Sequence, residues 1–235
     1  MTPRTRTIGL PSRQASLALA GTVALIAAAV TLGFGVQQSH AGDMPAGSAP
    51  VSMLTPKAIA FHDAMRGLWQ VHGTYTERAI VSFVAGNPDT NAVIGTLLQN
   101  QVDIGNAVKP YYGAAGGKAL TTLLTTHIND AVAVLKAAKA GDAAGTKKAS
   151  AAFYANGNQI ASFLHKANPH NWPLGALQTM MRIHLNQVIG LAVDQIKGKY
   201  NAAIALYESY INHLNVGMAD MLSNGIIKQF PGKFS

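Results

Sequence analysis

Three histidines occupy positions at which helical periodicity predicts apolar side chains. In the stretch TTLLTTHINDAVAVL (residues 121–135), His127 falls on the same predicted helical face as leucine, alanine and valine residues. His72 and His184 have the same setting in two other predicted helices. Because imidazole is a preferred ligand of zinc, copper and iron, buried histidines from three helices can form a metal site.

The three histidines belong to a repeated pattern. They lie 55 and 57 residues apart, and each precedes a glycine by fourteen positions and a polar residue by twenty-nine positions. The glycines are Gly86, Gly141 and Gly198, and the polar residues are Gln101, Asn156 and His213. The stretch LTTLLTTHINDAV also resembles LQTMMRIHLNQVI, and IASFL resembles MADML at an offset of 58. We interpret this pattern as three copies of one helical hairpin of about 56 residues.

If each glycine ends the first helix of a hairpin, the histidines lie at one depth in the bundle. Fourteen residues at a rise of about 1.5 Å place each ring about 21 Å from its turn, with its partner nearly level on the returning helix. This geometry predicts one polar layer in an otherwise apolar interior, made of His72, Gln101, His127, Asn156, His184 and His213.

The elements that position this layer are predicted to be helices alone. Ala, Leu, Gln and Met dominate the chain after residue 55, and no convincing stretch alternates with the period of a strand. Gly, Pro, Asn and Asp interrupt the helical pattern at 86–89, 109–117, 141–142, 168–173 and near 198. The sequence therefore predicts an all-α, six-helix bundle of three antiparallel hairpins, forming a single domain over residues 56–235.

A transition-metal site is the most specific function that this layer predicts. The expected metal is zinc, copper or iron, and the expected ligands are His72, His127, His184 and His213. Residues expected to orient these ligands or to add a carboxylate are Gln101, Asn156, Asp103, Asp130 and Glu208. Axial binding of haem by two histidines is a weaker variant, because the chain has no CxxCH.

Two other interpretations of the layer remain open. A mutually hydrogen-bonded layer can fix helix register without any ligand. Buried histidines can also act as a proton-sensitive switch, because burial lowers their affinity for protons. The alternative prediction is therefore a non-enzymatic envelope or small-ligand-binding protein whose layer is structural or pH-responsive.

No strong catalytic signature is present, so an enzyme is not the expected class. The chain has no cysteine, which excludes disulfides and thiolate chemistry. After residue 41 its only glutamates are Glu77 and Glu208, neither in the Glu-x-x-His spacing of di-iron bundles. The stretch GAAGGKA (113–119) lacks the spacing and the preceding strand of a phosphate-binding loop.

The N-terminus is predicted to direct export. The basic segment MTPRTRTIGLPSR precedes an apolar run, and Ser39-His40-Ala41 provides small residues for cleavage, so residues 1–41 are predicted to be a signal peptide. Residues 42–55 are predicted to be a flexible leader. The expected location is the periplasm or the outside of the cell, with an uncleaved membrane anchor as the alternative.

Charge limits the expected partners. Removal of the three arginines of residues 1–41 lowers the formal net charge from +8 to +5. This surplus favours weak association with an anionic envelope surface, but without interleaved aromatics it predicts no nucleic-acid partner.

Five stretches resemble an uncharacterised bacterial family of all-helical, often exported proteins: LWQVHGTYTERAI, LLQNQVDIGNAVKPYYG, YANGNQIASFL, NPHNW and MADMLSNGIIKQFPGKF. Typical members have Trp-Thr-Arg where this chain has Tyr75-Thr76-Glu77-Arg78. The resemblance implies a helical fold and no defined activity. Some members carry the labels glycosyltransferase or acetylglutamate kinase, which need α/β patterns that this sequence lacks.

Overall fold

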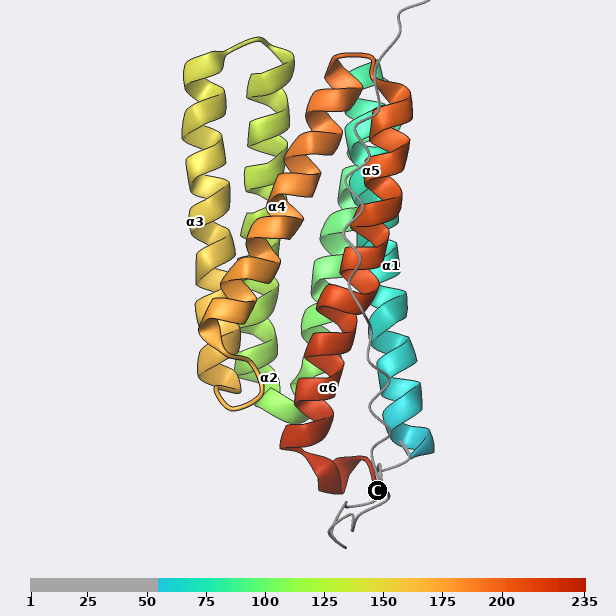
Figure 1. The fold of residues 1–235 in the computed structure, drawn as a ribbon, viewed down its shortest axis with the longest axis vertical. Helices are drawn as coiled ribbons and strands as arrows, with labels where there is room; N and C mark the ends of the chain where they lie inside the picture. The colour runs from blue at the N-terminus through green and yellow to red at the C-terminus, as the bar shows by residue number, and fades with distance from the viewer. Residues whose placement is uncertain (1–54) are drawn as a thin grey trace, which may run out of the picture. The chain divides into compact units, whose positions relative to one another are not determined.

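The computed structural model describes residues 55–235, whose long helices run side by side (Figure 1). The elements are α1 (Pro56–Ala85), α2 (Thr90–Lys139), α3 (Ala143–Ala167), α4 (Leu174–Ile196), α5 (Tyr200–Asn212), the π-helix η1 (His213–Ala219), α6 (Asp220–Gln229) and the 3-10 helix η2 (Pro231–Lys233). Within residues 55–235 there is no strand, so the predicted all-α class is confirmed. The predicted signal peptide, and the predicted leader up to residue 54, lie outside the described residues.

The start of α1 follows from local sequence. Thr55 Oγ1 accepts a hydrogen bond from Ala58 N at 3.2 Å, which satisfies one of the free N–H groups of the first turn. Pro56 fits the first helical position because its missing N–H would have had no helical partner there.

Three turns end their helices in the same way. Gly86, Gly141 and Gly198 have φ of 73°, 70° and 67°, a left-handed conformation that glycine adopts without a Cβ clash. In each turn the glycine N–H bonds the carbonyl three residues back, and the next N–H bonds the carbonyl five residues before it. This is the Schellman pattern of a helix C-terminus, and it reverses the chain within a few residues.

Two predicted boundaries differ from the structure. The helical pattern was expected to break over residues 109–117, but α2 continues through them with a kink at Gly113 (φ 73°, ψ 173°). Pro110 lies just before the kink and lacks the N–H that a regular helix would use. The last predicted helix is interrupted by η1, a π-helical segment between α5 and α6.

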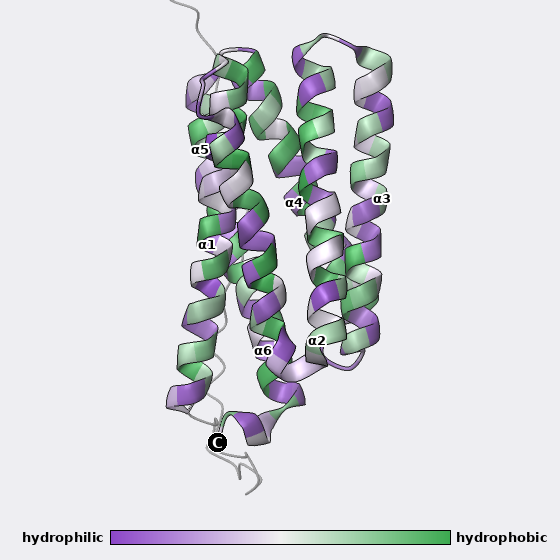
Figure 2. Ribbon diagram, turned by 180° about the vertical axis from the view of Figure 1, so that it is seen from behind, coloured by the Kyte–Doolittle hydropathy of each residue, from purple (hydrophilic) through white to green (hydrophobic). Residues whose placement is uncertain are grey.

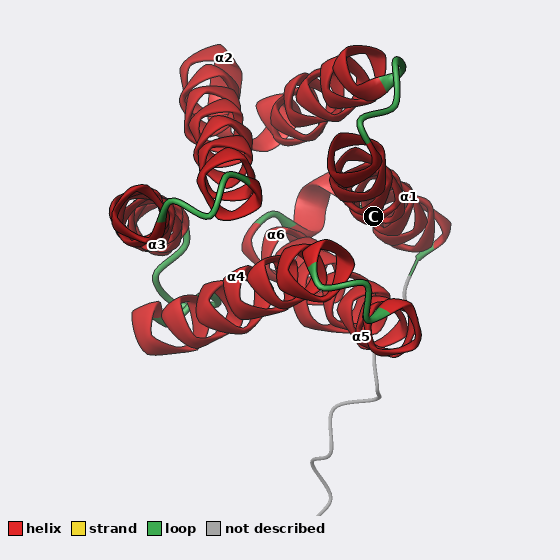
Figure 3. Ribbon diagram, turned by 90° about the horizontal axis from the view of Figure 1, so that it is seen from above, coloured by secondary structure: helices red, strands yellow, loops and turns green. Residues whose placement is uncertain are grey.

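The helices surround a common interior when viewed along their axes (Figure 3). Neighbours in the chain pack against each other, and α1 also packs against η1 and α6, which brings the first and last helices together. Polar and apolar residues alternate along each helix (Figure 2), as expected when one face is buried and the other is solvated. None of the described helices is both long and apolar enough to cross a membrane.

Candidate functional site

The structure brings the predicted histidines together. His72 on α1, His127 on α2 and His184 on α4 are buried, with at most 3% of each residue exposed. The ring centroid of His184 lies 5.7 Å from that of His72 and 5.6 Å from that of His127. The ring centroid of half-buried His213 lies 6.5 Å from that of His184. We call these four histidines, together with Gln101 and Asn156, the histidine layer.

Asn156 on α3 holds His127 in one tautomer. Asn156 Nδ2 donates to Leu123 O at 3.1 Å, which leaves Oδ1 facing His127 Nδ1 at 2.9 Å. An amide oxygen can only accept, so Nδ1 of His127 carries the ring proton. The lone pair of His127 is therefore on Nε2, the nitrogen that can bind a cation.

Gln101 holds His72 in the other tautomer, with the ring proton on Nε2. Gln101 Nε2 donates to Leu97 O at 2.7 Å and lies 3.2 Å from His72 Nδ1, so this ring nitrogen accepts. The proton of His72 is then on Nε2. Gln101 Oε1 is buried and has no hydrogen-bond partner among the described residues. A turn of the Gln101 amide would let its Oε1 accept from His72 Nδ1, which would leave the lone pair of His72 on the ring Nε2. The bonds from the amide to Leu97 O and Asn100 Oδ1 would then be lost.

His184 lacks such support. Its Nδ1 is buried and has no hydrogen-bond partner within residues 55–235. His213 occupies the corresponding position on the returning helix, but its Nε2 donates to Met180 O at 3.2 Å. The ring of Tyr210 stacks on His184 at 5.5 Å. A buried polar atom left unpaired destabilises a fold by about 1–3 kcal/mol, so His184 Nδ1, like Gln101 Oε1, is a costly atom of the layer.

Burial keeps the layer uncharged near neutral pH. It lowers the pKa of His72 to about 3 and that of His127 to about 4. The pKa of His184 falls well below its usual range, first through burial and then through the neighbouring histidines. Burial also lowers the pKa of His213, although its hydrogen bond to Met180 opposes the change. Neutral imidazoles are the form that binds transition metals.

Two apolar chambers meet at the layer, and His72, His127 and His184 line both. The aromatic-end chamber holds about 720 Å³ of space between atoms, part of it open to solvent, and its wall includes Met65, Trp69, Leu120, Leu164, Trp172 and Leu222. The turn-end chamber holds about 550 Å³ on the same measure, and its wall includes Thr76, Leu97, Ile128, Phe153 and Val188.

The expected carboxylates do not join the layer. Asp103 is exposed and accepts a hydrogen bond from Gln99 at 3.0 Å, and Glu208 is exposed as well. Asp130 is half-buried, and burial raises its pKa. As the side chains stand, no group of three or more His, Asp or Glu in the described chain is arranged to hold a metal ion. Coordination therefore requires the imidazoles to turn toward a common point.

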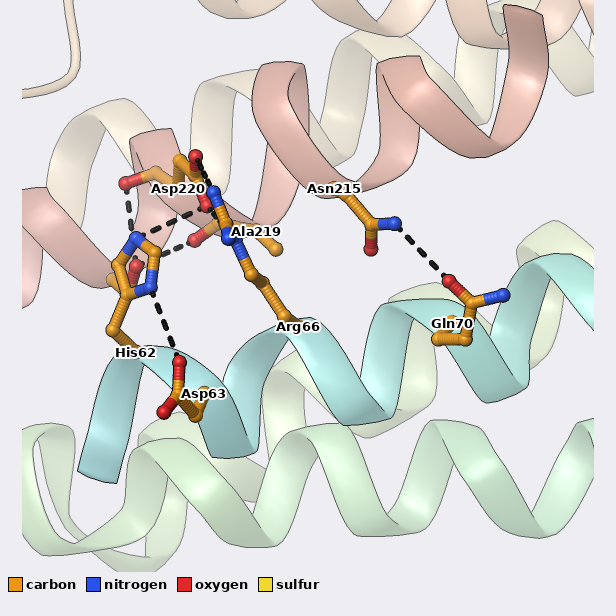
Figure 4. Close-up of polar contacts among 8 residues, drawn as sticks. His62, Asp63, Arg66, Gln70, Asn215, Ala219 and Asp220 are labelled. Atoms are coloured by element: carbon orange, nitrogen blue, oxygen red, sulfur yellow. Dashed lines mark hydrogen bonds and ion pairs between the residues drawn. The ribbon is translucent and has the colours of Figure 1, made fainter. Parts of the chain in front are cut away.

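A second polar cluster, absent from the sequence predictions, ties α1 to η1 and α6 (Figure 4). Arg66 donates two hydrogen bonds to the Asp220 carboxylate at 2.7 and 2.6 Å, and His62 Nε2 lies 3.0 Å from the same group. The bonds from Arg66 lower the pKa of Asp220. One turn along, Asn215 Nδ2 donates to Gln70 Oε1 at 3.1 Å. These contacts hold the end of the π-helix against α1.

Asn100 is a further layer residue that sequence reasoning missed. Its Nδ2 donates to Leu68 O at 3.0 Å, which joins α1 to α2 beside His72. Asn100 directly precedes Gln101, the residue that the spacing of twenty-nine positions from His72 selects. The available signal was the adjacent pair of amides, Asn100-Gln101.

Comparisons of the chain with protein-family models, with curated proteins and with solved structures found no match. The site therefore has to be interpreted from its own geometry.

Proposed function

We propose that the protein binds one transition-metal ion between His72, His127 and His184, with His213 at the edge of the site and without turnover. The observation that carries this proposal is His184 Nδ1, a buried ring nitrogen with no partner among the described residues, lying amid three other imidazoles. A cation at this nitrogen would offset the cost of leaving it unpaired.

We also infer that the bundle consists of three copies of one hairpin, each supplying one of these rings. A side chain on the returning helix bonds the carbonyl four residues before each histidine: Asn100 to Leu68, Asn156 to Leu123, and His213 to Met180. The three identical glycine turns support the same inference. On this view the kink at Gly113 separates the first hairpin from the second.

The π-helix supports the repeat as well. The third unit matches the second at an offset of 57 up to His213, but MADML matches IASFL at an offset of 58. A π-bulge accommodates one additional residue within an α-helix, and η1 lies at the point where the offset changes. Such bulges are frequent at functional sites, and this one begins at His213.

The ring spacing suits a shared ion after a small adjustment. Imidazole nitrogens bind zinc at about 2.0–2.1 Å, so the centroids of two rings on one tetrahedral ion lie about 5 Å apart. The observed separations of 5.7 and 5.6 Å exceed that value slightly. Turning the rings, rather than moving helices, is therefore the main change that binding requires.

The donor set favours borderline and soft metals. Neutral nitrogen ligands suit zinc, copper and iron, whereas magnesium and calcium need the oxygen ligands that this layer lacks.

We include export in the proposal, because the basic and apolar pattern of residues 1–41 is typical of a signal peptide.

Elemental analysis of the purified full chain tests the proposal, together with thermal melts in zinc, copper and chelator. At about 100 times its Kd, an ion would stabilise the fold by about 2.7 kcal/mol and raise the Tm by about 5–10 °C. His184→Gln should abolish this rise. His170→Gln, at an exposed position between α3 and α4, is the matched control and should keep it.

The competing explanation is a layer that only fixes helix register. It predicts that no metal co-purifies, that no tested ion raises the Tm, and that the two variants respond alike to metal. That result would refute the metal proposal and leave the layer with a structural role.

A further inference from the structure

The aromatic-end chamber has its own polar group, separate from the metal proposal. Trp69 on α1 lines this chamber, is 4% exposed, and its Nε1 has no hydrogen-bond partner among the described residues. Apart from the imidazoles of the histidine layer, the other polar side chains of this wall are paired: Tyr112 donates to Gln229 Oε1 at 2.7 Å, and Trp172 Nε1 donates to Met221 O at 3.1 Å. Outside the histidine layer, Trp69 therefore provides the one unpaired side-chain N–H among the described residues of this wall.

The chemistry of the wall limits what the chamber can hold. None of its lining residues is Lys, Arg, Asp or Glu, so a charged ligand would be buried without a partner at high cost. Met65, Met181 and Met218 contribute flexible thioethers, which make favourable contacts with aromatic rings. An uncharged aromatic molecule with one hydrogen-bond acceptor matches both features.

Leaving this chamber unfilled would destabilise the fold in two ways. The lining side chains lose dispersion contacts on the cavity side, and the indole N–H has given up its hydrogen bond to water without gaining another. A ligand that fills the space and presents an oxygen to Trp69 restores both interactions.

We propose that the aromatic-end chamber binds a small, uncharged aromatic molecule whose oxygen accepts a hydrogen bond from Trp69 Nε1. The turn-end chamber provides an internal comparison, because among the described residues of its lining the only buried, unpaired side-chain nitrogen or oxygen belongs to His184, which lines both chambers. The inference does not depend on a bound metal, so its test is made with chelator present throughout.

The indole N–H signals of the full chain, labelled with ¹⁵N, test the proposal directly. The chain has two tryptophans, Trp69 and Trp172, and the second is already bonded to Met221 O. Acetophenone supplies an aromatic ring with a carbonyl acceptor, ethylbenzene is a comparably shaped molecule without one, and benzoate adds a charge. Acetophenone should shift the Trp69 signal downfield and leave that of Trp172 nearly unchanged.

Variants test the hydrogen bond from Trp69 and the size of the aromatic-end chamber separately. Trp69→Phe keeps an aromatic side chain and removes the donor, so the affinity for acetophenone should fall by about 3- to 10-fold, toward that for ethylbenzene. Leu120→Phe reduces the aromatic-end chamber and should weaken both neutral probes. Leu97→Phe is the matched control, because the same substitution on the same helix reduces the turn-end chamber instead.

Three results would overturn the proposal: an unmoved Trp69 signal at saturating acetophenone, equal weakening by Leu97→Phe and Leu120→Phe, or benzoate binding as tightly as acetophenone. If Leu120→Phe does not fold, the Trp69→Phe comparison and the two indole signals still decide the question. Metal binding is measured separately, so either proposal can fail alone.

Discussion

His127 Nδ1 and Asn156 Oδ1 lie 2.9 Å apart, and the hydrogen bond between them joins α2 to α3 inside the bundle. The same amide donates to Leu123 O, so one side chain bonds both a buried ring and a backbone carbonyl of the facing helix. Both residues are at most 3% exposed, and water cannot replace the amide without entering the core.

Replacing Asn156 by Ala should therefore destabilise the metal-free protein by about 1–3 kcal/mol, because His127 Nδ1 loses its hydrogen-bond partner and Leu123 O loses the bond from the amide. Urea unfolding in chelator measures the change. Asn106→Ala removes an exposed amide from α2 and should alter stability by less than about 0.5 kcal/mol. Equal effects of the two substitutions would mean that the amide of Asn156 does not support the layer.

His184 and His127 should respond differently to replacement by Leu. In metal-free protein, His184→Leu removes an unpaired nitrogen and should leave stability unchanged or higher. His127→Leu leaves Asn156 Oδ1 without its donor and should destabilise by about 1–3 kcal/mol. Both variants should lose any stabilisation by metal. Chemical unfolding with and without zinc measures all four values, and a large loss for metal-free His184→Leu would indicate a missing hydrogen bond at Nδ1.

Acid should destabilise the metal-free protein through the same rings. The pKa values of His72, at about 3, and His127, at about 4, lie below the value of about 6.5 expected in the unfolded chain, so the unfolded state binds more protons below about pH 6.5. Stability is then complete above this pH and falls as the pH decreases toward 4. Each of these two rings should lower the free energy of unfolding by about 2 kcal/mol between about pH 7 and pH 5.

Urea unfolding at several pH values measures this slope. His127→Leu should reduce this pH dependence of the free energy of unfolding by about the contribution of one ring. His170→Gln, at an exposed position, should leave the pH dependence unchanged. A flat profile between pH 7 and pH 5 would contradict the burial of neutral imidazoles in the folded state.

Composition and apolar periodicity predicted the helices, and the repeated spacing selected most residues of the layer. The rule of twenty-nine positions pairs His72 with Gln101 and His127 with Asn156, and both pairs are in contact. Helical patterns carry this information because apolar faces and turn glycines repeat with the structural unit.

The sequence was less informative where a single residue decides orientation. Asp103 follows Gln101 by two positions, which is about 200° around a helix, and it faces solvent. The kink of α2 depends on one non-helical residue, Gly113, within a segment whose Pro and Gly content also suits a loop. The contact of Arg66 with Asp220 joins residues 154 positions apart, and no periodicity specifies such a pair.

The π-helix is the remaining case, and it provides a test of the repeat. If η1 contains one inserted residue, deletion of exposed Val216 should convert this segment into regular α-helix without turning the flanking helices. The variant should unfold cooperatively and lose less than about 2 kcal/mol. Deletion of exposed Ala152 from α3 is the control, because it rotates half of a regular helix by about 100° and turns Asn156 or its neighbours out of the core.

Circular dichroism melts compare the two deletions. Helical signal with a cooperative transition in the Val216 deletion, and loss of that transition in the Ala152 deletion, would identify η1 as an insertion into the third copy. If both deletions unfold the protein, the change of offset from 57 to 58 has another origin.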